Sequence, residues 1–379
     1  MSTRPVSSVL TLPSLQTLRA FVVVPALLAL SLAACNTAPA PAPEAGAAGG
    51  EPPPAPAPVA PPTHVVYVTN ERAGTLTMIN AETLEPFGTL ELGKRPRGIV
   101  ASSDRTRLYV ALSGSPIAGP GVDESKLPPA DKGADGIGEV DATRNRLLRV
   151  LRAGSDPEGV AVTKDGTQAF IANEDTGQVS VVQIADGSVS QTFEVGEEPE
   201  GISVSPDGSQ VWVTSEDAGA VYVIDLASKK VVTSVPVGAR PRSVAFLPDG
   251  SRAYIPAENE ALLAVIDTKT LKVVKKIALG EGMRPMGTAM APDGKLLYVS
   301  TGRSRMVLIV DTATNAVVGQ IEAGQRPWGI AISEDGTTLY TANGPSNDVS
   351  AIDLATRTVK KKIPAGDGPW GVVVVKRGS

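Results

Sequence analysis

A repeat of about 42 residues runs through the chain from residue 64 onward and constrains its fold more than any other feature. In the copy at 199–240, "PEGISVSPDGSQVWVTSEDAGAVYVIDLASKKVVTSVPVGAR", four short β-branched or alternating runs are separated by "PDGS", "EDAG" and "LASK". These separators are rich in the Asp, Gly, Ser and Pro that form tight turns. One period therefore predicts an antiparallel meander of four strands, called A to D here in chain order.

The repeat region begins with a strand B and ends with a strand A. Strand B occurs seven times, from "HVVYVTN" at 64 to "TLYTANG" at 338, and strand A seven times, from "RPRG" at 95 to "GPWG" at 368. The last strand A can thus complete the sheet begun by the first strands B, C and D. A closed ring needs such a seam, whereas an open array needs capping repeats at both ends. We predict an all-β fold: a seven-bladed β-propeller of four-stranded antiparallel blades over 64–379.

Lysines recur on strand D, the predicted outer edge of each blade. Exposed edges invite pairing with other chains, and lysines discourage it. The residues concerned are Lys229, Lys230, Lys275, Lys276 and Lys360 to Lys362.

Several motifs resemble the YVTN family of β-propeller repeats: "YVTN" at 67–70, the "SPDG"-like turns and the "VID...T" phrase. The resemblance covers 64–379. The order "RPRG", "PEG", "PEG", "RPRS", "RPWG" and "NGPSNDVSAID" is similar to seven-repeat periplasmic proteins associated with catabolism of alcohols by enzymes dependent on the quinone cofactor PQQ. This implies an accessory role in periplasmic oxidative metabolism. The segment 114–136 departs from that pattern.

The N-terminal segment is predicted to target and anchor the protein. Residues 1–34 contain Arg4, Arg19 and the apolar run "AFVVVPALLALSLAA", and "LAAC" resembles a bacterial lipobox ending at Cys35. The prediction is a lipoprotein signal peptide with lipid on Cys35; a buried free thiol is the alternative. Residues 35–63 follow as a Pro- and Ala-rich tether, with a reach of roughly 80 Å at ~3.1 Å per residue. The domain is then held at an extracytoplasmic membrane surface.

Composition argues against several kinds of chemistry. The only histidine is His64, at the edge of the tether, so the repeats offer no imidazole as a base or ligand. Cys35 is the only cysteine, which rules out disulfides within the chain. A net charge of -5 makes nucleic acid an unlikely partner unless a local patch provides the contact. Three tryptophans are too few for the docking turns of a quinoprotein dehydrogenase. We therefore predict no cofactor, no metal and no catalytic residue.

The loop from strand D to the next strand A lies at the mouth of a propeller's central channel. Around its proline, two adjacent repeats carry the acids Asp156, Glu158, Glu198 and Glu200, and the others are cationic or aromatic. Arginine suits carboxylate or phosphate, and indole offers a stacking face. Two interpretations are open: a binding mouth for a small anionic ligand or an acidic protein, or turns in which Arg and Glu pair and Trp covers the backbone. The candidate residues are Arg95, Arg97, Arg240, Arg242, Arg284, Arg326, Trp328 and Trp370.

The insertion 114–136 falls in a loop between strands B and C, on the same face as the mouth. Loops of this length are usually functional or disordered. Its acids Asp123, Glu124, Asp131 and Asp135 lack the alternating spacing of a calcium loop. A flexible lid, a docking loop for a partner and plain decoration stay open.

The sequence hypothesis for function is a lipid-anchored, monomeric, non-catalytic binding or scaffold module. Seven variable loops on one face form a broad platform, and no nucleophile, base and oxyanion site is evident. The first alternative is a lactonase-like propeller hydrolase, because such enzymes use acids and arginines of the channel, although usually with a histidine. The second is binding of single-stranded nucleic acid through the Arg and Trp residues.

Overall fold

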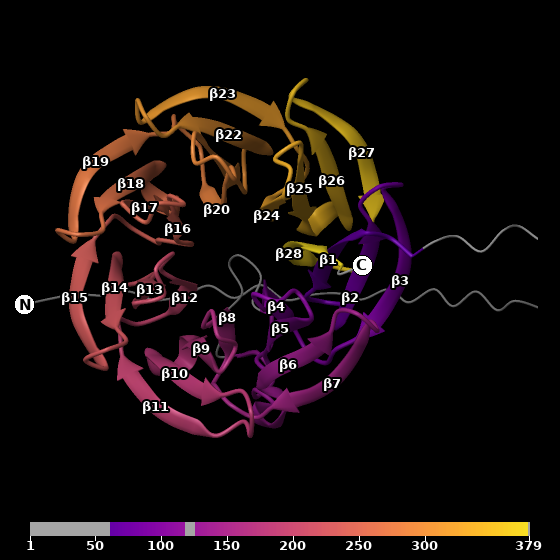
Figure 1. The fold of residues 1–379 in the computed structure, drawn as a ribbon, viewed down its shortest axis with the longest axis vertical. Helices are drawn as coiled ribbons and strands as arrows, with labels where there is room; N and C mark the ends of the chain where they lie inside the picture. The colour runs from indigo at the N-terminus through magenta and orange to yellow at the C-terminus, as the bar shows by residue number, and fades with distance from the viewer. Residues whose placement is uncertain (1–60, 118–125, 378–379) are drawn as a thin grey trace, which may run out of the picture. The chain divides into compact units, whose positions relative to one another are not determined.

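The computed structural model describes residues 61–117 and 126–377. They form seven four-stranded antiparallel sheets arranged around a central axis, as the view along that axis shows (Figure 1). The predicted all-β, seven-bladed propeller is confirmed. Contacts divide the chain into Met1–Pro58 and Val59–Ser379, and every sheet belongs to the second unit. The predicted signal peptide, Cys35, most of the tether and part of the insertion lie outside the described residues.

Each blade follows the predicted order A to D, from the channel to the rim. The innermost strands A are β4 (Pro96–Ala101), β8 (Pro157–Val162), β12 (Pro199–Val204), β16 (Ala245–Phe246), β20 (Pro285–Met290), β24 (Pro327–Ile332) and β28 (Pro369–Lys376). The strands B are β1 (His64–Asn70), β5 (Arg107–Leu112), β9 (Gln168–Asn173), β13 (Gln210–Ser215), β17 (Arg252–Ala257), β21 (Leu296–Thr301) and β25 (Thr338–Asn343).

The two outer strands of each blade are equally regular. The strands C are β2 (Thr75–Asn80), β6 (Gly136–Asp141), β10 (Gln178–Gln183), β14 (Ala220–Asp225), β18 (Leu262–Asp267), β22 (Met306–Asp311) and β26 (Asp348–Asp353). The strands D at the rim are β3 (Glu85–Glu91), β7 (Arg146–Leu151), β11 (Val189–Glu194), β15 (Lys230–Pro236), β19 (Lys272–Ala278), β23 (Ala316–Glu322) and β27 (Thr358–Pro364).

The seam of the ring lies within one sheet, ordered β28-β1-β2-β3. Strand β28 pairs antiparallel with β1, with Val375 opposite Val65 and Val372 opposite Val68. The two ends of the repeat region are therefore joined by backbone hydrogen bonds, as the phase of the repeat predicts.

Glycines let the inner strands approach one another closely. A Cβ atom on Gly201 would lie 2.4 Å from the carbonyl oxygen of Arg242, and one on Gly329 would lie 2.3 Å from that of Trp370. Such distances are far below van der Waals contact. Every strand A except that of the β16 blade has a glycine at this position. The others are Gly98, Gly159, Gly287 and Gly371.

Serine replaces this glycine in the β16 blade. Ser243 Oγ donates a hydrogen bond to the Met286 carbonyl oxygen at 2.9 Å. The inner strand of this blade is reduced to β16 and an isolated bridge between Pro241 and Ala257. The ring is therefore least regular at the segment that carries Arg242.

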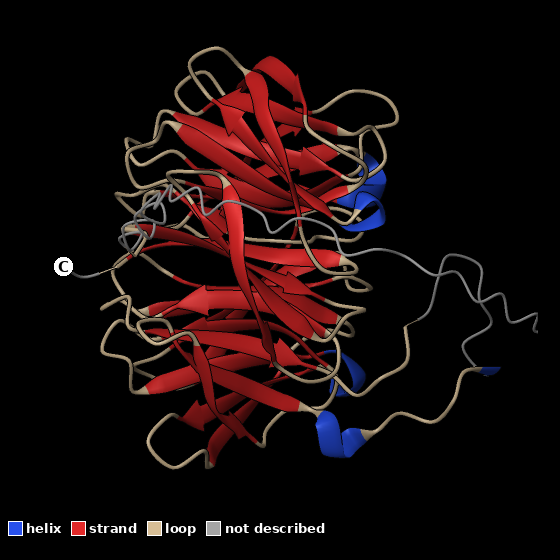
Figure 2. Ribbon diagram, turned by 90° about the vertical axis from the view of Figure 1, so that its right-hand side faces the viewer, coloured by secondary structure: helices blue, strands red, loops and turns tan. Residues whose placement is uncertain are grey.

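Short 3₁₀ turns follow several strands B and gather on one face of the domain (Figure 2). Because the loops from D to A end at the same side of each blade, this face is the mouth. Within the described residues, no helix has the length and hydrophobicity needed to cross a bilayer. The turns are η2 (Lys132–Ala134), η3 (Glu174–Thr176), η4 (Glu258–Glu260) and η5 (Gly344–Ser346).

Candidate functional site

The turns from D to A hold charged side chains in an unusual backbone conformation. The residue before the proline has positive φ in six blades, and in only one of them is it glycine, Gly368. For other residue types this conformation costs about 1 to 2 kcal/mol. Charged residues occupy these positions although the conformation is costly for them, which favours a role for their side chains at the mouth. They are Arg95 (φ 40°), Asp156 (φ 49°), Glu198 (φ 50°), Arg240 (φ 56°) and Arg326 (φ 48°).

A second set of glutamates follows strand B in four blades: Glu71, Glu174, Glu216 and Glu258. The amide of Glu216 donates to the carbonyl oxygen of Glu198 at 3.0 Å, which ties this set to the mouth turns. Sequence analysis missed these residues. The signal for three of them was their spacing, since positions 174, 216 and 258 differ by one repeat each.

Arg97 is the centre of one buried ion-pair cluster. Its guanidinium contacts Asp156 at 2.6 Å, Glu158, and Glu174 at 3.5 Å. The Arg97 side chain is 2% exposed. Burial acts to raise the pKa of Asp156, but the charges of Arg97 and Arg95 together with hydrogen bonds from Ser113 and Ser115 lower it overall. Neighbouring Arg95 pairs with Glu71 at 3.1 Å. Both arginines on this side of the mouth are therefore paired with carboxylates.

Arg242 is the centre of a second cluster. Its Nε and Nη2 atoms bond Glu258 Oε2 at 2.7 and 2.6 Å, which fixes the guanidinium plane. Its Nη1 atom then bonds both Glu200 and Glu216. The side chains of all three are at least 92% buried, being 8, 6 and 6% exposed. Arg240 also pairs with Glu216.

The two carboxyl groups bridged by Arg242 differ in acidity. Burial raises the pKa of Glu200 well above its ordinary value; Arg242 opposes this and the charge of Glu216 adds to it. Burial also acts to raise the pKa of Glu216, but the hydrogen bond with Glu200 and the charges of Arg242 and Arg240 lower it overall. The two pKa values are therefore shifted in opposite directions, so Glu200 binds a proton in preference to Glu216. Carboxyl pairs with separated pKa values suit acid-base catalysis.

An aromatic and cationic sector lies beside this pair. The rings of Trp328 and Trp370 are 5.6 Å apart between centroids and tilted by 36°. The guanidinium carbons of Arg242 and Arg326 lie 5.4 and 5.0 Å from the Trp328 centroid. Arg326 is exposed and, in the described part of the chain, has no carboxylate within ion-pair distance. Its donors are therefore available to an anion. Arg284 instead bonds the Asn259 side chain.

The central channel opens beneath these side chains as a cavity of about 240 Å³. All seven blades contribute to its wall, which includes Glu200, Arg242, Trp328 and Trp370. The hydroxyl-bearing residues Ser203, Ser243 and Thr288 line it as well and add polarity to the wall. The cavity is large enough for a small ring compound, with an acid, an arginine and an indole at its wall.

The structure separates the eight candidate residues into three groups. Four arginines pair with carboxylates, as the interpretation based on packing predicts: Arg95, Arg97, Arg240 and Arg242. Arg284 bonds the Asn259 side chain, whereas Arg326, Trp328 and Trp370 pack against one another in the sector beside the cavity. A ligand-binding mouth thus stays a prediction for this smaller set.

The base of the insertion is fixed to the mouth. Asp135 accepts hydrogen bonds from the amides of Gly114 at 2.7 Å and Asp156 at 3.2 Å, and Asp131 pairs with Lys94 at 2.8 Å. Asp123 and Glu124 lie outside the described residues. Nowhere in 61–117 and 126–377 do three or more His, Cys, Asp or Glu side chains form a group suited to a metal ion.

The family of the chain follows from a comparison with known protein families. The family model described as "Lactonase, 7-bladed beta-propeller" matches residues 80–363, about three quarters of the chain. The chain belongs to this lactonase family. No curated protein sequence matches it significantly.

Solved structures share the fold of this lactonase-family chain. A proposed 6-phosphogluconolactonase from Bacteroides fragilis is 21% identical, with 84% of this chain and 100% of that chain covered and a TM-score of 0.67. A second, from Bacteroides uniformis, is 20% identical, with 83% and 100% covered and a TM-score of 0.67. A functionally unknown protein from Desulfotomaculum acetoxidans is 14% identical, with 83% and 99% covered and a TM-score of 0.68. At such identities the likeness shows the fold alone.

Family membership corrects the sequence hypothesis about function. The prediction of a non-catalytic scaffold, with no enzymatic activity, was wrong, and the lactonase-like alternative is favoured. The prediction rested on the absence of a histidine from the repeats. It overlooked the buried carboxyl groups of Glu200 and Glu216, which Arg242 holds together.

Proposed function

We propose that this protein hydrolyses a lactone at the mouth of the channel. The observation that carries the proposal is the buried carboxyl pair Glu200 and Glu216, bridged by Arg242, with Glu200 and Arg242 at the wall of the cavity. Membership of the lactonase family supports the same reaction class.

The pair can move protons through both halves of ring opening. Release of the Glu200 proton to solvent leaves a carboxylate at the cavity wall, and its raised pKa makes that carboxylate a strong base. This carboxylate takes a proton from water as the water oxygen attacks the lactone carbonyl carbon. When the bond between the carbonyl carbon and the ring oxygen breaks, Glu200 returns that proton to the ring oxygen. The product is a hydroxy acid, which releases one proton to the solvent at neutral pH.

Arg326 and the tryptophans are proposed to bind the substrate. The free donors of Arg326 suit the oxyanion that develops on the carbonyl, or an anionic substituent of the lactone. The indole of Trp328 keeps this guanidinium beside Arg242. We therefore favour a small anionic lactone as the substrate.

The cellular setting is proposed from the sequence alone. The lipobox-like "LAAC" supports a lipid on Cys35, a signal peptide over 1–34 and an extracytoplasmic, membrane-anchored domain. The YVTN-like repeats and motif order support a place near periplasmic, PQQ-linked oxidation. An oxidation that converts a cyclic hemiacetal to a lactone would supply the substrate of a lactonase.

The test is titration at constant pH with a panel of γ- and δ-lactones, with and without a carboxylate or phosphate substituent. We expect base consumption above the uncatalysed rate for at least one anionic lactone. Glu200→Gln should abolish this excess, because an amide cannot shuttle the proton. The matched control is Glu197→Gln, which changes an exposed glutamate in the same turn.

Two results would overturn the proposal. Rates equal to the uncatalysed rate for every lactone would show that the protein does not hydrolyse them. Full activity in Glu200→Gln would show that the lactonase activity does not depend on this pair of glutamates.

A further inference from the structure

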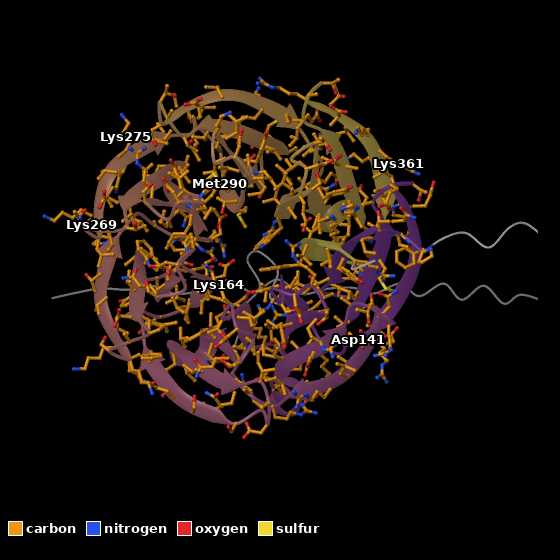
Figure 3. The ribbon with its side chains drawn as sticks, viewed as in Figure 1. Asp141, Lys164, Lys269, Lys275, Met290 and Lys361 are labelled. Carbon is orange, nitrogen blue, oxygen red and sulfur yellow. The ribbon has the colours of Figure 1, made fainter. Side chains whose placement is uncertain are left out.

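The rim of the propeller carries a positive surface that the mouth does not use. It consists of exposed lysines on or beside the outer strands of two neighbouring blades, β12–β15 and β16–β19. We call it the basic rim. Its members are Lys229, Lys230, Lys269, Lys272, Lys275 and Lys276. Lys269 and Lys275 point away from the ring in Figure 3.

These lysines have no ion-pair partners among the described residues, unlike the lysines of another blade. On β27, Lys360 pairs with Asp353 at 3.1 Å, Lys361 with Glu85, and Lys362 with Asp348 at 3.7 Å. The same edge position is thus neutralised in one blade and left charged in two others. Protection of a free edge explains lysines in all three blades but not this difference.

The acids nearest in sequence do not neutralise the basic rim. The carboxylates of Asp225 and Asp267 accept hydrogen bonds from the turns that follow them, at 2.7 Å from the Ser228 amide and 2.8 Å from the Thr270 amide. Glu281 is the acid nearest in sequence to Lys275 and Lys276, and six ammonium groups against three carboxylates leave an excess of three positive charges. In a protein whose formal net charge is -5, this is a strong local departure.

Apolar side chains are exposed among the lysines. Val232 on β15 is 47% exposed and Val274 on β19 is 54% exposed. The two blades pack together through a common core that includes Val235 and Val273. The basic rim is therefore one surface on a rigid base, with short apolar side chains between flexible cationic ones.

We propose that the basic rim docks on an anionic lipid bilayer. Lysines near such a surface each contribute about 1 kcal/mol, and the exposed valines add shallow contact with the interface. Surfaces that bind other proteins are enriched in aromatic residues and arginine, and the basic rim contains neither. Because the basic rim lies at the side of the ring, the mouth opens alongside the bilayer and stays accessible. This inference does not depend on the proposed lactonase activity.

The test is co-sedimentation with vesicles of phosphatidylcholine alone or mixed with phosphatidylglycerol. It uses residues 36–379, which keep every strand of the seven sheets and lack Cys35. Binding is expected to the anionic vesicles only, and to weaken as salt rises. Lys275→Gln with Lys276→Gln should weaken binding about tenfold or more.

The matched control is Lys361→Gln with Lys362→Gln, at the equivalent positions of β27 and with the same change in net charge. It should bind like the unchanged protein. Equal loss in both double variants would overturn the proposal, since net charge alone would then explain binding. Binding to both vesicle types alike would also overturn it. So would binding to immobilised polyglutamate but to neither vesicle, which would indicate an acidic protein instead.

Discussion

The guanidinium carbon of Arg326 lies 5.0 Å from the centroid of the Trp328 ring, and in the part of the chain that the structure describes this arginine has no ion pair. The other arginines beside the cavity are held by carboxylates or an amide. Arg326 is thus a cation whose donors a substrate could use without first breaking an ion pair.

Arg326→Ala should lower kcat/KM for the anionic lactone about ten- to hundredfold, the loss expected for one charge-assisted hydrogen bond. The melting temperature should stay within a few degrees, because the side chain is exposed. Arg305→Ala, which removes an exposed arginine paired with Glu322, is the control. Normal turnover together with early melting would assign Arg326 to packing alone.

The acidity of Glu200 predicts the pH dependence of stability. Its folded pKa is raised well above 4.5, so the folded protein retains a proton that the unfolded chain releases. Stability from this group is therefore complete below pH 4.5 and declines as pH rises toward the folded pKa, by at most about 1.4 kcal/mol per unit. Glu200→Gln should flatten that decline in urea unfolding. An unchanged pH profile would show that Glu200 is ionised in the fold.

Loss of Arg97 should destabilise the protein strongly. Arg97→Ala leaves buried Glu158 without its counterion and Asp156 with only Arg95 at 3.9 Å; breaking a buried ion pair in this way typically costs about 3 to 5 kcal/mol. Arg105→Ala removes a pair with Glu334 whose members are 41 and 34% exposed, and should cost less than about 1 kcal/mol. The comparison is made by urea unfolding, and similar losses for the two variants would contradict a buried cluster.

Truncation tests closure of the ring. Removing 368–379 deletes β28 and the buried side chains Val372, Val374 and Val375, and should cost several kcal/mol at about 1.5 to 3 kcal/mol for each buried side chain. Removing 36–60, which lie outside the seven sheets, should leave the melting temperature unchanged. Equal melting temperatures for the two truncations are incompatible with the shared sheet.

Lipidation is tested at Cys35, the only cysteine of the chain. Cys35→Ala should leave the precursor uncut, or release the protein from membranes once they are washed with high salt. The salt wash matters because it removes any contribution of the basic rim. Mature Cys35→Ala protein that survives the wash on membranes would refute the lipid anchor.

Much of the fold could be predicted because turn chemistry and strand alternation recur in every repeat. "PDGS" between strands A and B and the phase of "GPWG" at 368 sufficed for seven blades and their seam. These signals are local, and each can be recognised in several copies because the sequence repeats. The position of the candidate site followed as well, since the loop from D to A ends at the mouth in any such ring.

Contacts within the site could not be predicted in the same way. Arg97 reaches forward to Asp156 in the next blade, whereas Arg242 reaches back to Glu200 in the preceding one. Equivalent sequence positions thus choose opposite partners, according to which neighbouring turn offers a carboxylate. The spacing of Glu216 by one repeat from Glu174 and Glu258 marks it as a repeat position, but the sequence does not reveal that its side chain meets Arg242.

The seam has a consequence for the order of synthesis. Trp370, part of the cavity wall, lies on β28, the strand that also closes the ring. During translation the first three strands of this sheet lack their fourth strand, β28, until nearly the whole repeat region has left the ribosome. A chain that stops before Pro369 lacks both the closing strand and one wall of the cavity. Ring closure and completion of the cavity are therefore a single event, and an incomplete chain cannot present a finished site.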